Sequence, residues 1–318
     1  MWTPRWSRML LGSAGILLAA GTAWAGEPPP AAVPGFVNGQ VLINEYPSGG
    51  DNDLLTGGLG AAGLQRPPSG PPVVYPPPVS SPPTAEELRT LAIYNNYRAL
   101  VDTTSGGGYG WLYGPLVGPT TADAEGKIYG VEYLAYAKGR GGDQNVTLMV
   151  QIPEAFDPAK ACVVTGPSSG SRGIYGAIGT SGEWGLKKGC AVAYTDKGTG
   201  TGAHDLERDM VSLLRGERVP ADEAGERSNF TAPISDAERL AFNARHPDRW
   251  AWKHAHSELN PEADWDRHVL LSLEFALWAL NDRYGGARLT WGNTLVIASS
   301  SRTAAAPRCA RPRSRPRA

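Results

Sequence analysis

The feature that most constrains the fold is a set of three short apolar runs, each followed by small polar residues. The runs are ACVVTG (161–166), CAVAYTD (190–196) and NTLVIASS (293–300). Continuous apolar runs separated by helices are typical of strands in a parallel sheet buried on both faces. In such sheets the chemistry lies at the carboxyl ends of the strands. The sequence therefore predicts an α/β fold with functional residues in GPSSGSRG, DKGTGTG and SSSRT, which follow these runs.

A long helix is predicted over 261–284, between the second and third runs. Asn260 is the expected N-cap and Pro261 occupies the first helical position. Acidic residues follow in the first turn, where they favour the positive end of the helix dipole. One apolar stripe runs along this helix, formed by Val269, Leu273, Leu277, Leu280 and Tyr284.

Further upstream, Thr84 and Glu87 form a capping box at the start of another helix. The segments YGVEYLAYAK (129–138) and QNVTLMVQIP (144–153) are then predicted as two strands joined by a glycine-rich hairpin connection.

The first 25 residues have the pattern of a secretory signal peptide: two arginines, an apolar run and Ala-Trp-Ala before the expected cleavage site. The run is too short and too rich in small residues to favour the alternative, a membrane anchor. We therefore expect a secreted or periplasmic protein beginning near Gly26. Residues 26–83 hold 14 of the 27 prolines and are expected to form an arm, partly docked through DNDLLTGGLGAAGLQ, with regular order starting at Thr84.

Three cysteines leave one unpaired if a disulfide forms in an exported protein. Cys162 and Cys190 each adjoin a predicted strand and are the candidate pair, although Cys162 is equally compatible with a free thiol in the core. Cys309 lies in the unusual C-terminal sequence. The spacing of the three does not resemble a metal site.

The last segment, 301–318, contains six arginines and no acidic residue. Since the whole chain has a net charge of −1, the remainder is acidic and gives no reason to expect a nucleic-acid partner. One interpretation of the segment is a basic arm that binds a polyanion.

Three stretches resemble the bacterial D-(-)-3-hydroxybutyrate oligomer hydrolases: LAIYNNYRALVD, KHAHSELNPEADW and the long string from PSSGSRG to GAHDL. The resemblance covers roughly residues 51–300. It implies an α/β-hydrolase-like, mostly parallel sheet and a serine esterase that cleaves short 3-hydroxybutyrate oligomers released from polyhydroxybutyrate. It implies no metal or organic cofactor, and a small-molecule ester as the partner. Family members are considerably longer, so the sheet is expected to be incomplete at the C-terminus.

The position expected for the nucleophile follows the third run. The family pattern there resembles apolar-Ser-Asn-Gly-Gly-Gly-Ala-Ala, which suits a strained turn carrying a serine. This chain has Ser301, then Arg302 in the nucleophile position, followed by TAAAP. If each codon from 301 onward is read from one base earlier, the likely codons for these residues permit the sequence VSNGGGAALRA. The sequence therefore suggests a frameshift near 300 or 301, with 301–318 out of frame.

These observations leave no intact catalytic residue in this chain, because the acid and base of the triad follow the serine in this fold. The oxyanion-hole candidates are Ser169, Gly170 and Ser171, with a glycine- and serine-rich turn as the alternative interpretation. We expect no activity and poor folding, over a domain organisation of 1–25, 26–83, 84–300 and 301–318. The alternative functions are another secreted esterase, of tannase or feruloyl-esterase type, and a non-catalytic binding protein with a basic tail.

Overall fold

The computed structural model describes residues 32–64, 77–100, 126–139, 145–168, 172–196, 202–254, 259–285 and 288–299. Its strands are β1 (Val37–Tyr46), β2 (Gly130–Lys138), β3 (Asn145–Pro153), β4 (Cys162–Pro167), β5 (Ala191–Thr195), β6 (His204–Asp205), β7 (Met210–Ser212), β8 (Arg218–Pro220), β9 (Trp250–Ala251) and β10 (Leu295–Ile297). The α-helices are α1 (Gly60–Leu64), α2 (Ala85–Leu100), α4 (Glu183–Lys187), α5 (Ala221–Ala224), α6 (Asp236–Asn243) and α7 (Trp265–Arg283). Shorter helical turns are η1 (Pro158–Lys160), η2 (Ile174–Ala177), η3 (Ile178–Gly182, a π-helix), η4 (Gly225–Arg227) and η6 (Pro261–Asp264).

A mixed six-stranded sheet forms the centre of the described structure, in the order β1-β2-β3-β5-β4-β10. β4 pairs in parallel with β5 on one side and with β10 on the other. The remaining three pairings, β1 with β2, β2 with β3 and β3 with β5, are antiparallel. The predicted α/β class is thus confirmed, and so are the 130–153 hairpin and the parallel alignment of the three apolar runs.

The prediction of a mostly parallel sheet is wrong for the described residues, because antiparallel pairings outnumber parallel ones. The sequence did not predict the pairing of β1 with β2 or the pairing of β3 with β5. β1 lies inside the predicted arm, so regular order begins well before Thr84. A register shift between Asn38 and Leu42 interrupts its strand pattern, and Gly39 there has a φ of 76°.

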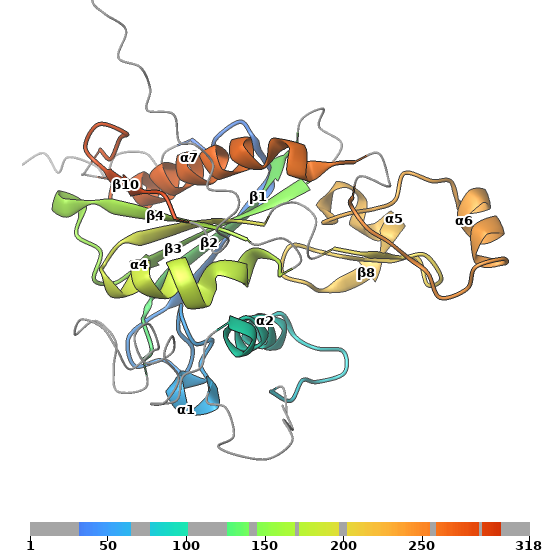
Figure 1. Ribbon diagram of the computed structural model, residues 1–318, viewed down its shortest axis with the longest axis horizontal. Helices are drawn as coiled ribbons and strands as arrows, with labels where there is room; N and C mark the ends of the chain where they lie inside the picture. The colour runs from blue at the N-terminus through green and yellow to red at the C-terminus, as the bar shows by residue number, and fades with distance from the viewer. Residues whose placement is uncertain are drawn as a thin grey trace, which may run out of the picture.

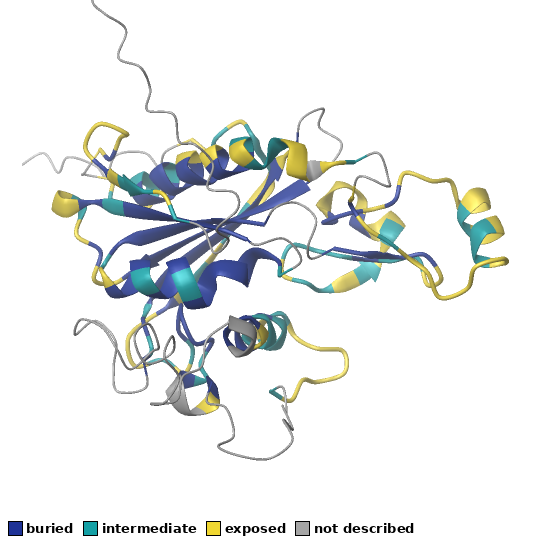
Figure 2. Cartoon of the chain, viewed as in Figure 1, coloured by how far each residue is buried: buried dark blue, intermediate teal, exposed yellow. Residues whose placement is uncertain are grey.

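Helices cover the two faces of the central sheet (Figure 1). α7 packs on one face, where Leu273, Phe275 and Leu280 join side chains such as Val163 and Ala191 of the strands. α2, η2, η3 and α4 lie on the other face, whose core includes Val164 and Val192. Neighbouring residues of β4 and β5 therefore point into different cores, and Figure 2 shows the strands between the two layers as buried.

The predicted capping interactions are present at the start of one helix and only partly present at the start of the other. At α2 the Thr84 hydroxyl accepts from the Glu87 N–H (3.2 Å) and the Glu87 carboxylate accepts from the Thr84 N–H (2.7 Å), which confirms the capping box. The long predicted helix divides into η6 and α7. Asn260 is the N-cap residue of η6 and Pro261 begins that turn, as predicted, but the Asn260 side chain makes no capping hydrogen bond. The predicted stripe is correct: four of its residues are buried, and Tyr284 packs against the same core.

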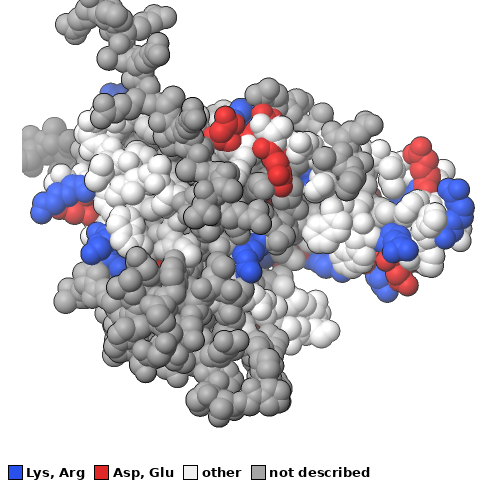
Figure 3. All heavy atoms as spheres, in the orientation of Figure 1, with Lys and Arg blue, Asp and Glu red and all other residues white. Residues whose placement is uncertain are grey.

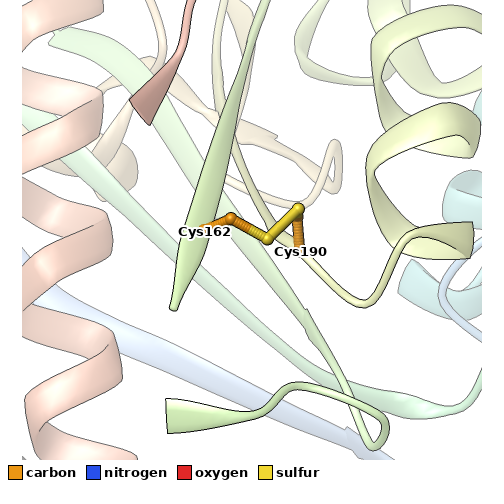
Figure 4. The surroundings of a disulfide bond; sticks show 2 residues. All are labelled: Cys162 and Cys190. Atoms are coloured by element: carbon orange, nitrogen blue, oxygen red, sulfur yellow. A yellow bond between two sulfur atoms is a disulfide. The ribbon is translucent and has the colours of Figure 1, made fainter. Parts of the chain in front are cut away.

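Cys162 and Cys190 form a disulfide that joins the first residue of β4 to the residue before β5 (Figure 4). The structure thus decides between the two interpretations of Cys162 in favour of the bond. The bridge lies at the amino ends of these parallel strands, opposite the ends where chemistry is expected.

β10 differs from the buried strand that its sequence predicts. It is three residues long and contacts β4 at the edge of the described sheet, and 63% of the Leu295 side chain is exposed. An apolar run is buried on both faces only where other elements cover it, and the described part of the chain places little over Leu295.

A smaller antiparallel sheet, in the order β8-β7-β6-β9, extends from the central body together with α5 and α6 (Figure 1). On the face drawn in Figure 3, Lys and Arg side chains are interspersed with Asp and Glu over this extension. Across the described ranges, none of the helices has both the length and the apolar character that crossing a membrane requires.

Candidate functional site

The strand order reverses at β4, which defines a candidate site. From β4 the chain passes through η2, η3 and α4 on one face to reach β5, and later through α7 on the other face to reach β10. β5 and β10 therefore lie on opposite sides of β4. Sheets with such a switch point bind ligands in the crevice outside the carboxyl ends of the strands.

The ends of β4 and β10 are fastened together by Thr165 and Ser299. The Ser299 N–H donates to Thr165 Oγ1 (2.9 Å), and this hydroxyl donates to the Ser299 carbonyl (2.9 Å). Ser299 Oγ donates to the Thr165 carbonyl (2.6 Å) and lies 2.7 Å from Ser181 Oγ in η3. These contacts hold the backbone just before position 301 at the carboxyl edge of the sheet.

The same contacts argue against Ser299 as a nucleophile. Its hydroxyl is bonded to a carbonyl and to another hydroxyl, neither of which is a base that removes a proton. Ser299 therefore positions the strand end. No local sequence signal predicts the hydrogen bonds of Ser299 with Thr165 and Ser181, because these contacts span more than a hundred residues.

The predicted oxyanion-hole residues Ser169, Gly170 and Ser171 lie outside the described residues, as does Arg302. The structure therefore does not test these predictions. It does describe the two flanks of the 169–171 loop. On one side the buried Ser168 donates its N–H to the Thr195 carbonyl (2.8 Å). On the other, a Cβ added at Gly176 would lie 2.7 Å from Ser168 Oγ and 3.1 Å from Arg172 Cβ. The loop thus begins and ends close to one point above β4.

One histidine, His268 of α7, is buried near Asp196 at this edge, and burial lowers its pKa against the opposing effect of Asp196. No described contact brings another histidine to the edge. His204 is buried in β6, where Nδ1 accepts from the Ala232 N–H (3.2 Å). Nε2 consequently carries the proton and donates to Asp209 (2.8 Å). His204 therefore connects the smaller sheet to its loops. His254 is exposed, and His256 lies outside the described residues.

Two buried ionisable residues, Asp196 and Lys253, lie at the carboxyl end of the neighbouring strand β5. Asp196 follows this strand; its N–H donates to the carbonyl of Thr147 near the start of β3 (3.1 Å), and its carboxylate accepts from the Thr147 N–H (3.3 Å). Lys253 donates to the carbonyls of Asn145 and Asn229. Burial lowers the pKa of Lys253 to about 8, against the opposing effect of Asp196. The carboxyl edge of the sheet therefore carries ionisable groups beyond those the sequence indicated.

A cavity of about 180 Å³ opens on the α2 side of the sheet. Its walls come from α2, from β1 and β2, from 172–175 and from the 213–216 turn between β7 and β8. Its charged lining residues are Glu86, Arg89, Arg172 and Arg215, and its apolar residues include Leu88, Leu134, Ile174 and Leu214. The sequence alone did not identify this cavity, because its walls, which also include Thr147 and Asn229, come from seven distant segments.

Arg89 holds one wall of the cavity in place. Its guanidinium makes two 3.1 Å hydrogen bonds with the buried Glu132 carboxylate and stacks on the Tyr46 ring. Glu132 also accepts from the Tyr175 hydroxyl (2.9 Å). Burial raises the pKa of Tyr175, and Glu132 raises it further, so this hydroxyl stays protonated and donates. Arg89 is thus committed to the core rather than to a ligand.

These features define a mixed α/β protein whose candidate site lies at the carboxyl ends of its parallel strands. The chain belongs to the 3HB-oligomer hydrolase family, whose family model matches residues 17–311. No solved structure gave a significant match.

Three relatives illustrate the similarity; each bears the name D-(-)-3-hydroxybutyrate oligomer hydrolase. The protein from Polaromonas sp. (strain JS666 / ATCC BAA-500) is 54% identical over 274 residues, covering 83% of this chain and 38% of the relative. The one from Azoarcus sp. (strain BH72) is 57% identical, covering 77% and 35%. The one from Paraburkholderia xenovorans (strain LB400) is 48% identical, covering 90% and 41%. The chain spans about two fifths of the length of the curated relatives that it matches.

Proposed function

We propose that this chain carries the first part of the catalytic domain of an exported α/β-hydrolase-type enzyme that cleaves ester bonds in short 3-hydroxybutyrate oligomers. The observation that carries the proposal is the clamp between Thr165 and Ser299, which holds Ser299, shortly after β10, at the carboxyl edge of the sheet. Family membership supplies the substrate class.

The chemistry follows from that position. In this type of hydrolase a serine in a sharp turn after a strand attacks the ester carbonyl, and a second step hydrolyses the acyl-enzyme. Backbone N–H groups after the nucleophile and in the loop following an earlier strand stabilise the oxyanion. The nucleophile belongs at position 302, after β10, and the second set of donors at Ser169, Gly170 and Ser171, after β4.

Arg302 occupies the nucleophile position in this chain, and a guanidinium does not attack an ester carbonyl. We therefore expect the 318-residue protein to lack activity. Incubating it with the 3-hydroxybutyrate dimer and following release of the monomer tests this expectation. Release at the buffer rate agrees with it, whereas saturable turnover contradicts it.

The segment from 301 onward is explained by a shift of reading frame, since the neighbouring frame permits VSNGGGAALRA at that place. The family model matches as far as residue 311, so the end of the match does not locate the proposed shift near residue 301. The nucleotide sequence across codons 295–318 is the decisive observation. The proposal requires that the frame displaced by one base encode a serine at 302 followed by glycines; a different sequence there rejects it.

Export of the protein is supported by the Cys162–Cys190 disulfide, because such bonds persist mainly in oxidising compartments. The proposed signal peptide, 1–25, lies outside the described residues. Expression in a bacterium and N-terminal sequencing of the periplasmic or secreted product test the proposal. A new N-terminus near Gly26 supports export, and an intact Met1 on a cytoplasmic product argues against it.

A further inference from the structure

The α2-side cavity is lined by three arginines and by Glu86, which accepts a hydrogen bond from the Asn52 side chain (2.9 Å). Arg89 is paired with Glu132, and Arg215 lies 3.0 Å from Glu217. The guanidinium of Arg172 forms no ion pair or hydrogen bond within the described part of the chain. Arg172 therefore presents an unpaired cation to a cavity whose walls are otherwise largely apolar.

The backbone of Arg172 is fixed close to the candidate site. Its carbonyl accepts from the Asn96 side chain of α2 (3.4 Å), which also bonds to the Ala92 carbonyl. Arg172 comes directly after the 169–171 loop, and its Cβ lies near the same point above Gly176 as the Ser168 side chain at the end of β4. A ligand bound by Arg172 would thus lie beside the carboxyl ends of the strands.

The chemistry of this cavity suits one end of the proposed substrate. An oligomer of 3-hydroxybutyrate carries a methyl branch on every unit and a single negative charge, on its terminal carboxylate. A guanidinium binds a carboxylate through two parallel hydrogen bonds, and apolar walls accommodate methyl groups. The volume of about 180 Å³ is smaller than that of a typical pocket for a whole ligand, so it matches a terminal unit rather than the complete oligomer.

We propose that this cavity is a subsite for the carboxylate-bearing end of the oligomer, with Arg172 as its carboxylate-binding residue and Arg215 beside it. This inference rests on the proposed function, because it takes its ligand from there. It makes Arg172 a determinant of specificity for free acids, in contrast to neutral esters of the same length.

Binding to the 318-residue protein tests the subsite without requiring catalysis. Isothermal titration with the 3-hydroxybutyrate dimer as free acid and as its methyl ester is expected to give tighter binding of the acid by about tenfold or more. Arg172→Gln should reduce the affinity for the acid to that for the ester, and Arg172→Lys should restore part of it. Arg245→Gln, which removes a cation from the distant helix end after α6, should change neither affinity.

Thermal unfolding of each variant shows that the comparison concerns folded proteins. Equal affinities for acid and ester, an unchanged affinity in Arg172→Gln, or no binding by the folded protein would each overturn the subsite. The two proposals fail separately. Acid binding that depends on Arg172, in a protein whose frame-restored form hydrolyses no oligomer, leaves the subsite intact and rejects the function. If the frame-restored form hydrolyses the oligomer but shows no preference for free acids over neutral esters, the proposed function is kept and the subsite is rejected.

Discussion

Individual buried charges, rather than exposed ones, hold the walls around the candidate site. Arg89 and Glu132 expose 6% and 0% of their side chains, and Glu132 accepts from Arg89, Tyr175 and Gln151. Because all these donors converge on one carboxylate, the α2 helix and the 172–175 segment are both anchored to β2. Damage to this network would therefore reach the cavity as well as the core.

Substituting Glu132→Gln should lower the free energy of unfolding by about 3–5 kcal/mol, because it leaves the Arg89 guanidinium buried without its counter-charge. Urea unfolding followed by circular dichroism measures the change. Glu45→Gln is the matched control, since it removes the exposed partner of Arg283 and should cost less than about 1 kcal/mol. Similar losses in the two variants would show that burial of the Arg89 pair is unimportant.

Glu183 should make stability depend on pH. Burial raises its pKa to about 7 from 4.5, against the opposing effect of Lys187. Between these two values the folded protein holds a proton that the unfolded chain has lost, so the free energy of unfolding falls as pH rises through this window. The decrease is at most about 3 kcal/mol.

To isolate this effect, the free energy of unfolding is measured between pH 4.5 and 8 for wild type and for Glu183→Gln. The variant should lose stability less steeply than wild type as pH rises. Burial lowers the pKa of Lys187, and a lowered lysine pKa acts with the opposite sign, so that it makes stability rise with pH. Parallel profiles for the two proteins would exclude Glu183 as the source.

Among the elements, β4 and β5 are joined both by hydrogen bonds and by the disulfide. The bridge between Cys162 and Cys190 closes a loop of 28 residues that contains η2, η3 and α4. A cross-link of this kind restricts the unfolded chain more than the folded one. It therefore stabilises the segment that leads into and out of the 169–171 loop.

Replacing both cysteines by alanine should reduce the free energy of unfolding by about 3 kcal/mol. Addition of dithiothreitol to wild type should produce a comparable shift in the urea midpoint and should leave the double variant unchanged. Equal stability of oxidised wild type and the double variant would contradict a stabilising role for the bridge.

Among the described residues β10 is an edge strand of the central sheet, and the unpaired backbone groups of an edge strand can bind another chain. The exposed Leu295 adds an apolar side chain there. We expect the 318-residue protein to self-associate, and Leu295→Lys to reduce this association, as measured by light scattering over a range of concentrations. Leu270→Lys, on the exposed side of α7, is the control. An equal decrease in both variants would indicate general solubility rather than the strand edge.

The elements that the sequence predicted well are those with local signals. Thr84 and Glu87 lie three residues apart and cap α2, and the stripe from Val269 to Leu280 follows one helix face. Contacts between distant segments were not predictable in this way. The bulge near Gly39 obscured β1, and the cavity around Arg172 exists only once seven segments are brought together. The partnership of Thr165 with Ser299 is of the same kind.

At the scale of the whole molecule, the central sheet and the family match support the same interpretation. The switch point at β4, the clamp to β10 and the Arg172 cavity all lie towards the carboxyl ends of the strands, while the disulfide lies at the other ends. If the proposed function is right, a chain of this organisation supplies the scaffold and part of the substrate pocket. The reacting serine is the component that the account assigns to position 302.

The most direct test is the rate of 3-hydroxybutyrate dimer hydrolysis by the protein expressed from the gene with its reading frame restored at codon 301. We expect saturable hydrolysis that is lost when the restored serine at 302 is replaced by alanine, with circular dichroism unchanged. No hydrolysis by the folded, frame-restored protein, or full activity after the alanine replacement, would contradict it.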